Sequence, residues 1–581
     1  MSSVDASAGG AAADSSGSDR PMSHRLIQLV ERLGDLANPI LVKEVRQSLK
    51  SRQFVATFLL LLAAAWVVTM FGLVTQADSL EFGSAGSGFF SAFYVVLAVA
   101  TILIVPFTTF RSLQSERDAD TYELLSITTL SPRQIVWGKL LSALVQLFVF
   151  YSAITPFIAF TSMLQGFDAP SAAFVLIASM LLSLLLSMQA LMFSTLARTK
   201  VSQGFMTLVV LAGLAWSLIG TLSTGIGAIS TGAITVTSRD FWIGTGIVFV
   251  TAASYFFLFL QITTAQLMFE SGNRSTGIRV AVAVQFWLFW AAIVLLLPYM
   301  TGSGSGPGSE GLMLAIIPPI IHWSVAGLFF VTEPDSLSRR LRRRLPRRFP
   351  LRLAAAPLMP GGARGFLFVL LHMAAHWCLC LGLIALYRTS LGSYSVSGFT
   401  MEGFLAAVAT FNPQAWNAPL RMLTAMCLYI VIYQGIGTAL GRWLRTVAAD
   451  IRPAHVRVLT FLILMAAVIG PFLPRTVGLL EWRDYSILDI GNPMATLPRL
   501  ESRSRSLHVE ILVCLAILGT LSLLINLPAM VRGVRQILRP LGTGNPGPEP
   551  APAVTASAAA TPDVEISPPL PPMAAEEPPA G

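Results

Sequence analysis

The sequence predicts an all-α, polytopic membrane protein with about twelve transmembrane helices. Of its 581 residues, 54% are hydrophobic and only 12% are charged, and the mean hydropathy is +0.68. A soluble chain would carry about 25% charged residues. Several apolar runs reach ~20 residues, which is enough to cross a bilayer as a helix. Because these runs are continuous rather than alternating, they exclude a β-barrel.

The apolar runs form two groups of six. The first group is expected at residues 54–75, 88–110, 135–163, 170–197, 204–223 and 241–268. The second is expected at residues 280–300, 311–331, 366–387, 418–440, 457–474 and 508–529. Prolines 298, 318, 319 and 471 lie within the second group, where they are expected to kink helices rather than end them.

The positions of the basic residues predict the orientation. If the N-terminus is inside, 31 of the 39 Lys and Arg residues fall on cytoplasmic segments and 8 on outer ones. This asymmetry is typical of membrane proteins. It places both termini in the cytosol, with the spans in the cell's inner (cytoplasmic) membrane. It also accounts for the net charge of +9 without a nucleic-acid partner.

The richest basic run, residues 339–348, falls in a predicted cytosolic loop at 332–365. It either binds anionic lipid headgroups or only marks the cytoplasmic side. Nucleic-acid binding is disfavoured, because no aromatic interleaving or nucleic-acid module accompanies the run.

Composition divides the rest of the chain. Both ends are low in complexity and are expected to be disordered. No signal peptide precedes the first span, which is therefore expected to insert as an uncleaved anchor. The predicted regions are a disordered segment at 1–22, interfacial helices at 23–53, a six-span core at 54–270, a further membrane region of about six spans at 271–540, and a Pro/Ala-rich tail at 541–581.

A basic amphipathic helix is predicted just before the first span. Asn38 and Pro39 are a helix-start signal, an N-cap followed by an N1 proline. The helix is expected to run from Ile40 to about Arg52 and to carry Lys43, Glu44 and Arg46 among apolar residues. A helix of this kind lies flat in the membrane interface.

A short polar island follows the second span and is the most informative stretch of the chain. Its charged and leucine-bearing part is predicted to be a short amphipathic helix within a cytosolic loop at 111–134. Ser131 and Pro132 then look like the N-cap and first residue of the third span. The island comprises Glu116, Arg117, Asp118, Asp120, Thr121, Glu123, Leu124 and Leu125.

Followed by Leu130-Ser131-Pro132 and Gly138-Lys139, this island resembles the coupling region of permeases of type-2 ATP-binding-cassette (ABC) exporters. The segment Asn38–Arg46 is similar to the interfacial N-terminal helix of that family. The resemblance covers roughly residues 38–270. It implies that the island docks on a separate cytosolic ABC ATPase and that the chain pairs with a second permease, as a homo- or heterodimer. The six additional spans depart from the common family pattern and contain no second copy of the coupling motif.

The chain contains no phosphate-binding loop. Gly138-Lys139 lacks the upstream glycine and is followed by Leu140. No catalytic residues or cofactors are therefore expected in this chain. ATP and Mg²⁺ would be bound by the partner subunit, which would hydrolyse the ATP.

His372 and His376 are the weak metal-ligand candidates of the sequence. Their i, i+4 spacing puts both rings on one helix face, with Cys378 and Cys380 just beyond. No carboxylate accompanies them within the span, so a polar seam between helices is the favoured interpretation.

Two other functional classes stay open. One is a membrane enzyme acting on lipid-linked substrates, with its site in the outer loops, although no paired carboxylates or Ser/His/Asp set can be identified there. The other is an ion-coupled secondary transporter. Acidic residues are scarce within the spans, which argues against this class.

Overall fold

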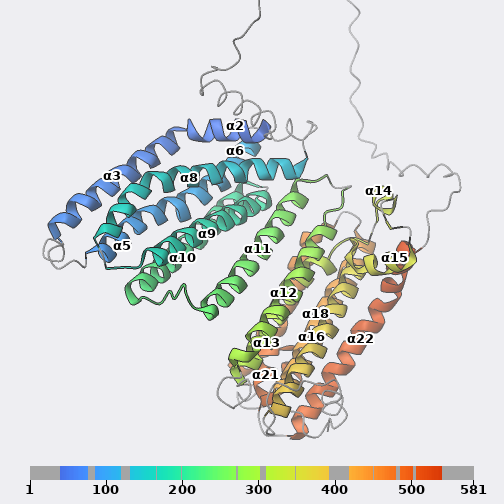
Figure 1. The fold of residues 1–581 in the computed structure, drawn as a ribbon. Helices are drawn as coiled ribbons and strands as arrows, with labels where there is room; N and C mark the ends of the chain where they lie inside the picture. The colour runs from blue at the N-terminus through green and yellow to red at the C-terminus, as the bar shows by residue number, and fades with distance from the viewer. Residues whose placement is uncertain are drawn as a thin grey trace, which may run out of the picture. The chain divides into compact units, whose positions relative to one another are not determined.

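A computed structural model describes residues 39–75, 85–118 and 131–538, except 165, 198, 270–271, 301–308, 336, 344, 347, 391–417, 449–450, 479–484 and 502–504. None of these residues forms a strand, and twelve of the helices are long and apolar enough to span a membrane. The predicted fold class is therefore confirmed: the protein is an all-α, multi-pass membrane protein (Figure 1).

The first helices form a bundle around spans two, three and four. In chain order they are α2 (Pro39–Leu49), α3 (Arg52–Thr75), α5 (Gly86–Ala98), the π-helical turn η1 (Val99–Ile104), α6 (Val105–Asp118), α8 (Pro132–Met163), α9 (Ala169–Leu196), α10 (Lys200–Thr231) and α11 (Arg239–Leu267). The second span consists of α5, η1 and α6 in one continuous helix.

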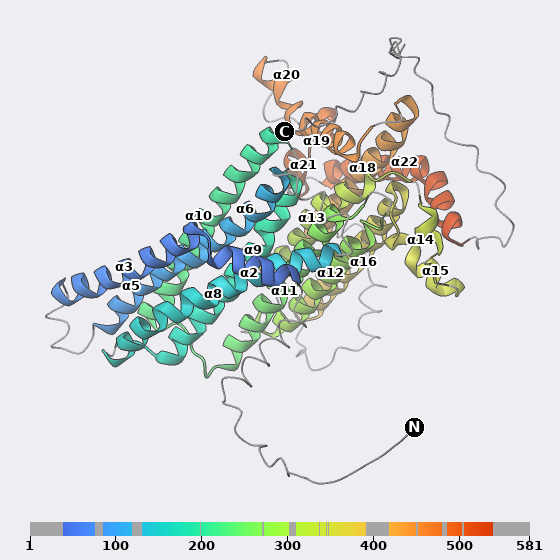
Figure 2. The same cartoon turned by 90° about the horizontal axis from the view of Figure 1, so that it is seen from above.

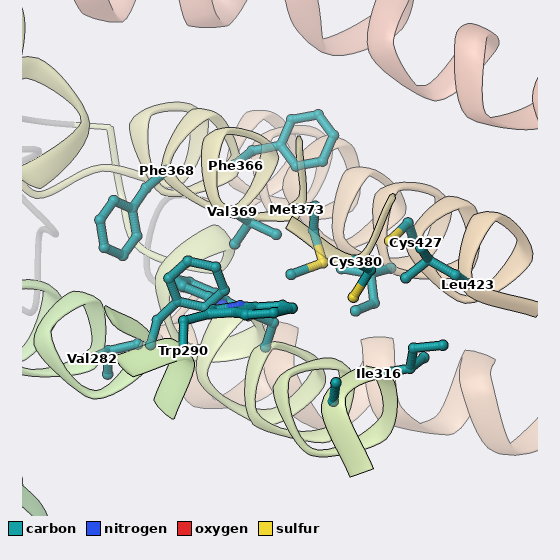
Figure 3. Close-up of a cluster of buried hydrophobic side chains, with 14 of the residues drawn as sticks. Val282, Trp290, Ile316, Phe366, Phe368, Val369, Met373, Cys380, Leu423 and Cys427 are labelled. Carbon is teal, nitrogen blue, oxygen red and sulfur yellow. The ribbon is translucent and has the colours of Figure 1, made fainter. Parts of the chain in front are cut away.

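The later helices enclose a second core. They are α12 (Thr276–Met300), α13 (Ser309–Val331), α14 (Arg339–Arg343), α15 (Phe349–Ala355), η2 (Ala356–Leu358), α16 (Gly362–Ser390), α18 (Ala418–Val447), α19 (Pro453–Ile469), α20 (Phe472–Thr476), η5 (Ile487–Gly491), α21 (Pro493–Glu501) and α22 (Arg505–Leu538). Their aromatic, sulfur-containing and aliphatic side chains meet in the interior, where Trp290, Met373 and Cys380 point toward one another (Figure 3).

Helix α13 lies unusually close to α16. A Cβ atom at Gly365 would lie 2.4 Å from the Phe330 carbonyl oxygen. Only glycine permits two helix backbones to approach in this way.

Several predicted boundaries need correction. The amphipathic helix predicted to run to about Arg52 is α2 and ends at Leu49, because Arg52 already begins α3. Span eleven is interrupted before Pro471, whose ring removes a backbone donor, and the chain resumes as α20. By contrast, Pro318 and Pro319 lie inside α13 without ending it.

The start of α8 confirms the predicted cap. The Ser131 hydroxyl accepts a hydrogen bond from the Gln134 backbone N–H, and the Gln134 side-chain oxygen accepts one from the Ser131 N–H at 2.8 Å. This reciprocal pair satisfies two of the donors that a helix start leaves unpaired.

We expect Ser131→Ala to lower the free energy of unfolding by about 1 kcal/mol, because alanine cannot accept the Gln134 N–H. SDS titration in mixed micelles, followed by tryptophan fluorescence, measures the change. Ser131→Asp is the control, since aspartate is also a good N-cap and should retain most of the stability. Equal stability of the alanine variant and the parent would contradict the prediction.

Candidate functional site

A buried lysine on α8 joins three helices at one end of the first bundle. The Lys139 Nζ atom lies 3.3 Å from Glu44 Oε1 on α2 and 2.9 Å from Glu116 Oε1 near the end of α6. The exposed fractions of these side chains are 2% for Lys139, 11% for Glu44 and 14% for Glu116. We call these three residues the Lys139 triad.

Helix periodicity explains how the triad forms. Glu44 and Ser48 are four residues apart on α2, and Lys139 and Ser142 are three apart on α8, so each pair shares one helix face. The two faces meet, because the Ser48 and Ser142 hydroxyl oxygens lie 2.9 Å apart. In both ribbon views α2 lies beside α8 (Figure 1; Figure 2).

The triad binds both flanks of the predicted docking segment. Glu116 lies just before residues 119–130, and Lys139 lies in the helix that follows them. A buried ammonium between two carboxylates is costly to separate, since separation leaves desolvated charges without their partner. The end of α6, the start of α8 and α2 are therefore held together.

Only part of the predicted coupling region lies within the described residues. Arg117 and Asp118 belong to the last turn of α6, so the polar island begins as a continuation of span two rather than as a separate helix. Glu116, the first residue of the island, forms an ion pair with Lys139 within the chain, and its predicted role in docking on a partner stays a prediction. Outside the described residues lie Asn38, Asp120, Thr121, Glu123, Leu124 and Leu125.

Helix α2, which the sequence predicts to lie in the membrane interface, carries exposed basic residues and one buried acidic residue. Pro39 is its first residue, and Lys43 and Arg46 are exposed, whereas Glu44 is buried against α8. The sequence motif therefore combines exposed basic side chains with one buried acidic residue, which holds the helix against the bundle.

His372 and His376 lie in an aromatic seam between α12, α13 and α16. The His372 ring centroid is 4.5 Å from those of both Trp323 and Phe368, and its Nδ1 atom lies 2.8 Å from the Phe368 carbonyl oxygen. The His376 Nε2 atom lies 3.7 Å from Cys380 Sγ. Within the described part of the chain, no three His, Cys, Asp or Glu side chains gather as a metal site would require. This arrangement favours the polar-seam interpretation.

A second buried charge network was missed by the sequence analysis, which counted Arg279 only as a marker of orientation. Its side chain is fully buried. One terminal nitrogen donates to the carbonyl oxygens of Pro357 at 2.7 Å and Met359 at 2.6 Å. The other donates to Glu333 Oε2 at 2.7 Å and to the Gly361 carbonyl oxygen at 3.0 Å.

The same loop is held by further contacts. Glu333 Oε2 accepts a hydrogen bond from the Gly361 N–H at 3.0 Å, and Asp335 Oδ1 accepts one from the Ala363 N–H at 2.9 Å in the first turn of α16. Arg445 donates to the Glu333 carbonyl oxygen at 3.2 Å. These bonds fasten the segments that flank α14 and α15 to the ends of the spans. No residue spacing in the sequence signals such a network.

At the other end of the second core, Arg475 and Asp489 form a bidentate ion pair. The two nitrogen–oxygen distances are 2.8 and 2.6 Å. Burial raises the pKa of Asp489, but hydrogen bonds from Arg475 and Ser486 outweigh burial and hold that pKa below its ordinary value. Asp489 also anchors η5, since its carbonyl oxygen accepts the Thr496 hydroxyl at 2.8 Å. This carboxylate therefore has a structural role: it pairs with Arg475 and holds η5 in place.

The chain matches no protein-family model, no curated protein and no solved structure. The resemblance to type-2 ABC exporter permeases therefore stays a prediction that rests on the sequence motif.

Proposed function

We propose that this protein is the membrane-spanning permease subunit of an ABC exporter. It would form the translocation path with a second permease and couple to a separate cytosolic ATPase through residues 116–127. The observation that carries this proposal is the Lys139 triad. It joins the interfacial helix to both flanks of the coupling segment, and its members come from the two sequence motifs of the resemblance.

The Lys139 triad suggests how a force that the ATPase exerts on residues 119–130 would be transmitted to the membrane spans. When ATP binding closes the ATPase pair, a force on residues 119–130 would act on the end of α6 and the start of α8. Because Lys139 holds both helices to α2, the three would move as one body rather than bend separately. Closure would then favour one arrangement of spans two and three over another, as a shift of populations by differential contacts.

In the proposed docking contact, apolar and acidic side chains have different roles. Leu124 and Leu125 would fill an apolar groove on the ATPase, while Asp120 and Glu123 would pair with basic residues at its rim and set orientation. ATP and Mg²⁺ would be held entirely by the partner. Residues 116–127 would face the cytosol, in agreement with the bias of basic residues.

We expect Glu123→Arg to reduce ATPase association by at least about tenfold, because reversing one interfacial charge places like charges together. The full-length tagged protein would be purified in mild detergent from its own host. ATPase activity and any co-purified polypeptide with a phosphate-binding loop would then be measured.

Glu81→Arg is the matched control, since it makes the same charge reversal in the loop predicted on the opposite side of the membrane. It should retain the ATPase. Equal ATPase recovery with both variants would count against docking at Glu123. Recovery of no ATPase even with the parent protein would count against the exporter assignment itself.

A further inference from the structure

The short helices α14 and α15 carry arginines and exposed apolar side chains on one element. Arg343 and Arg348 are exposed, and Arg342 is half-buried. Phe349, Leu351 and Leu353 on α15 are 62%, 53% and 49% exposed. We call these six residues the α14–α15 surface.

This element is firmly attached to the ends of the spans. Arg352 donates from Nε to the Pro346 carbonyl oxygen at 2.6 Å and from Nη1 to the Leu538 carbonyl oxygen at 3.5 Å. The second bond reaches the last residue of α22, and α15 lies across that end of the helix (Figure 1).

Apolar packing completes the attachment. Leu341 and Leu345, on and just after α14, pack against a buried cluster formed by Ala356, Met359 and Ile537, the last of which lies on α22. Leu341 and Leu345 are therefore packed on this cluster, whereas the larger apolar side chains of α15, Phe349, Leu351 and Leu353, are exposed.

The position of the element identifies its partner. It is connected to the end of α13 and to the starts of η2 and α16, and it contacts the end of α22. Where candidate spans end, the surroundings are lipid headgroups and the boundary of the acyl chains. Exposed Phe and Leu beside arginines are the composition of a segment that lies in this interface. Basic residues close to it attract anionic headgroups.

We propose that the α14–α15 surface is a docking site for anionic phospholipids, with Phe349, Leu351 and Leu353 inserted at the acyl boundary and the arginines on the phosphates. Each arginine near an anionic surface strengthens the interaction about fivefold. The proposal depends on the spans crossing a bilayer and is independent of the exporter assignment.

Phe349→Trp provides a local probe, since position 349 is exposed and the added ring is of similar character. The full-length variant would be reconstituted in phosphatidylcholine vesicles containing either brominated phosphatidylglycerol or brominated phosphatidylcholine at equal mole fraction. The signal of the parent protein, which has 11 tryptophans, is subtracted. We expect quenching by both lipids, stronger with phosphatidylglycerol, and a smaller difference at high salt because charge is screened.

Replacing Arg342, Arg343 and Arg348 by Gln in the Phe349→Trp protein should abolish the difference between the two lipids while leaving quenching itself. The matched control replaces Arg111, Arg133 and Lys200, three exposed basic residues on the helices α6, α8 and α10. It should preserve the difference. If the triple arginine variant does not fold, Arg348→Gln alone should reduce the preference in the same direction.

Three results would overturn the proposal. Absence of quenching would mean that α15 does not contact the bilayer. Equal quenching by both lipids in the Phe349→Trp protein would mean that the arginines do not select headgroups. A change in the emission of the introduced tryptophan on addition of a double-stranded oligonucleotide, without lipid preference, would instead assign the surface to nucleic acid.

Discussion

Lys139→Met is expected to lower the free energy of unfolding by about 3–5 kcal/mol, because it leaves the carboxylates of Glu44 and Glu116 buried without their shared ammonium. The Lys139 side chain is only 2% exposed, so water does not replace it. Unfolding by SDS in mixed micelles, followed by tryptophan fluorescence, measures the loss. Proteolysis near residues 119–130 should also become faster, because the ion pairs that join α2 and α6 to α8 are lost.

Two further variants separate the triad from general effects of losing a lysine. Arg133→Met removes an exposed cation from the first turn of the same helix and should change stability by less than about 0.5 kcal/mol. The combination Glu44→Gln, Glu116→Gln and Lys139→Met removes all three charges and should recover most of the loss, since an uncharged set needs no buried counterion. A triple variant no more stable than Lys139→Met, or a Lys139→Met protein as stable as Arg133→Met, would refute the role of the triad.

Under the proposed exporter function, the same triple variant tests mechanism separately from stability. If the three charges only stabilise the bundle, the recovered protein should also recover ATP-dependent transport. If they transmit movement from the coupling segment to the spans, transport should stay impaired while ATPase association is normal.

Arg279→Met is expected to cost about 3–5 kcal/mol of unfolding free energy as well. Its fully buried guanidinium satisfies the Glu333 carboxylate and the carbonyl oxygens of Pro357, Met359 and Gly361. Removing it leaves four oxygen acceptors without this donor at a largely buried site. The guanidinium also lies over the Phe330 ring, 5.3 Å from its centroid. The same SDS titration measures the loss.

Arg279→Lys distinguishes the charge from the geometry. Lysine keeps the positive charge but cannot present the planar fork that reaches two carbonyl oxygens with one nitrogen and Glu333 with the other, so an intermediate loss is expected. Arg239→Met, at an exposed position, is the control and should be close to neutral. If Arg279→Met matched this control, the network around Glu333 would not stabilise the second core.

Membrane helices and their capped starts were predictable because the properties that specify them are local. Hydropathy over ~20 residues located the spans, and Ser131-Pro132 marked the start of α8 before any packing was known. The boundary errors also have local causes. A charged residue such as Arg52 can begin a span, and the proline at 471 interrupts a helix that hydropathy alone continues.

The candidate site was predictable only as separate pieces. Glu44, Glu116 and Lys139 each lay in a motif of the resemblance, but Lys139 and Glu44 are 95 residues apart, and nothing in their spacing pairs them. From the sequence, Arg279 and Arg133 had the same interpretation: both were basic residues near span ends that help to predict the orientation of the chain. The structure buries the first against four oxygen acceptors and exposes the second.

The amino-acid sequence alone determined the class of protein, its dozen apolar helices and the uneven distribution of its basic residues. Each of these depends on neighbouring residues and on the free energy of transferring side chains from water to lipid. The burial and pairing of particular charges depended on the three-dimensional fold, because those contacts join helices that are distant along the chain. Whether a lysine at a span end binds water, lipid or two glutamates is decided by which helix lies beside it.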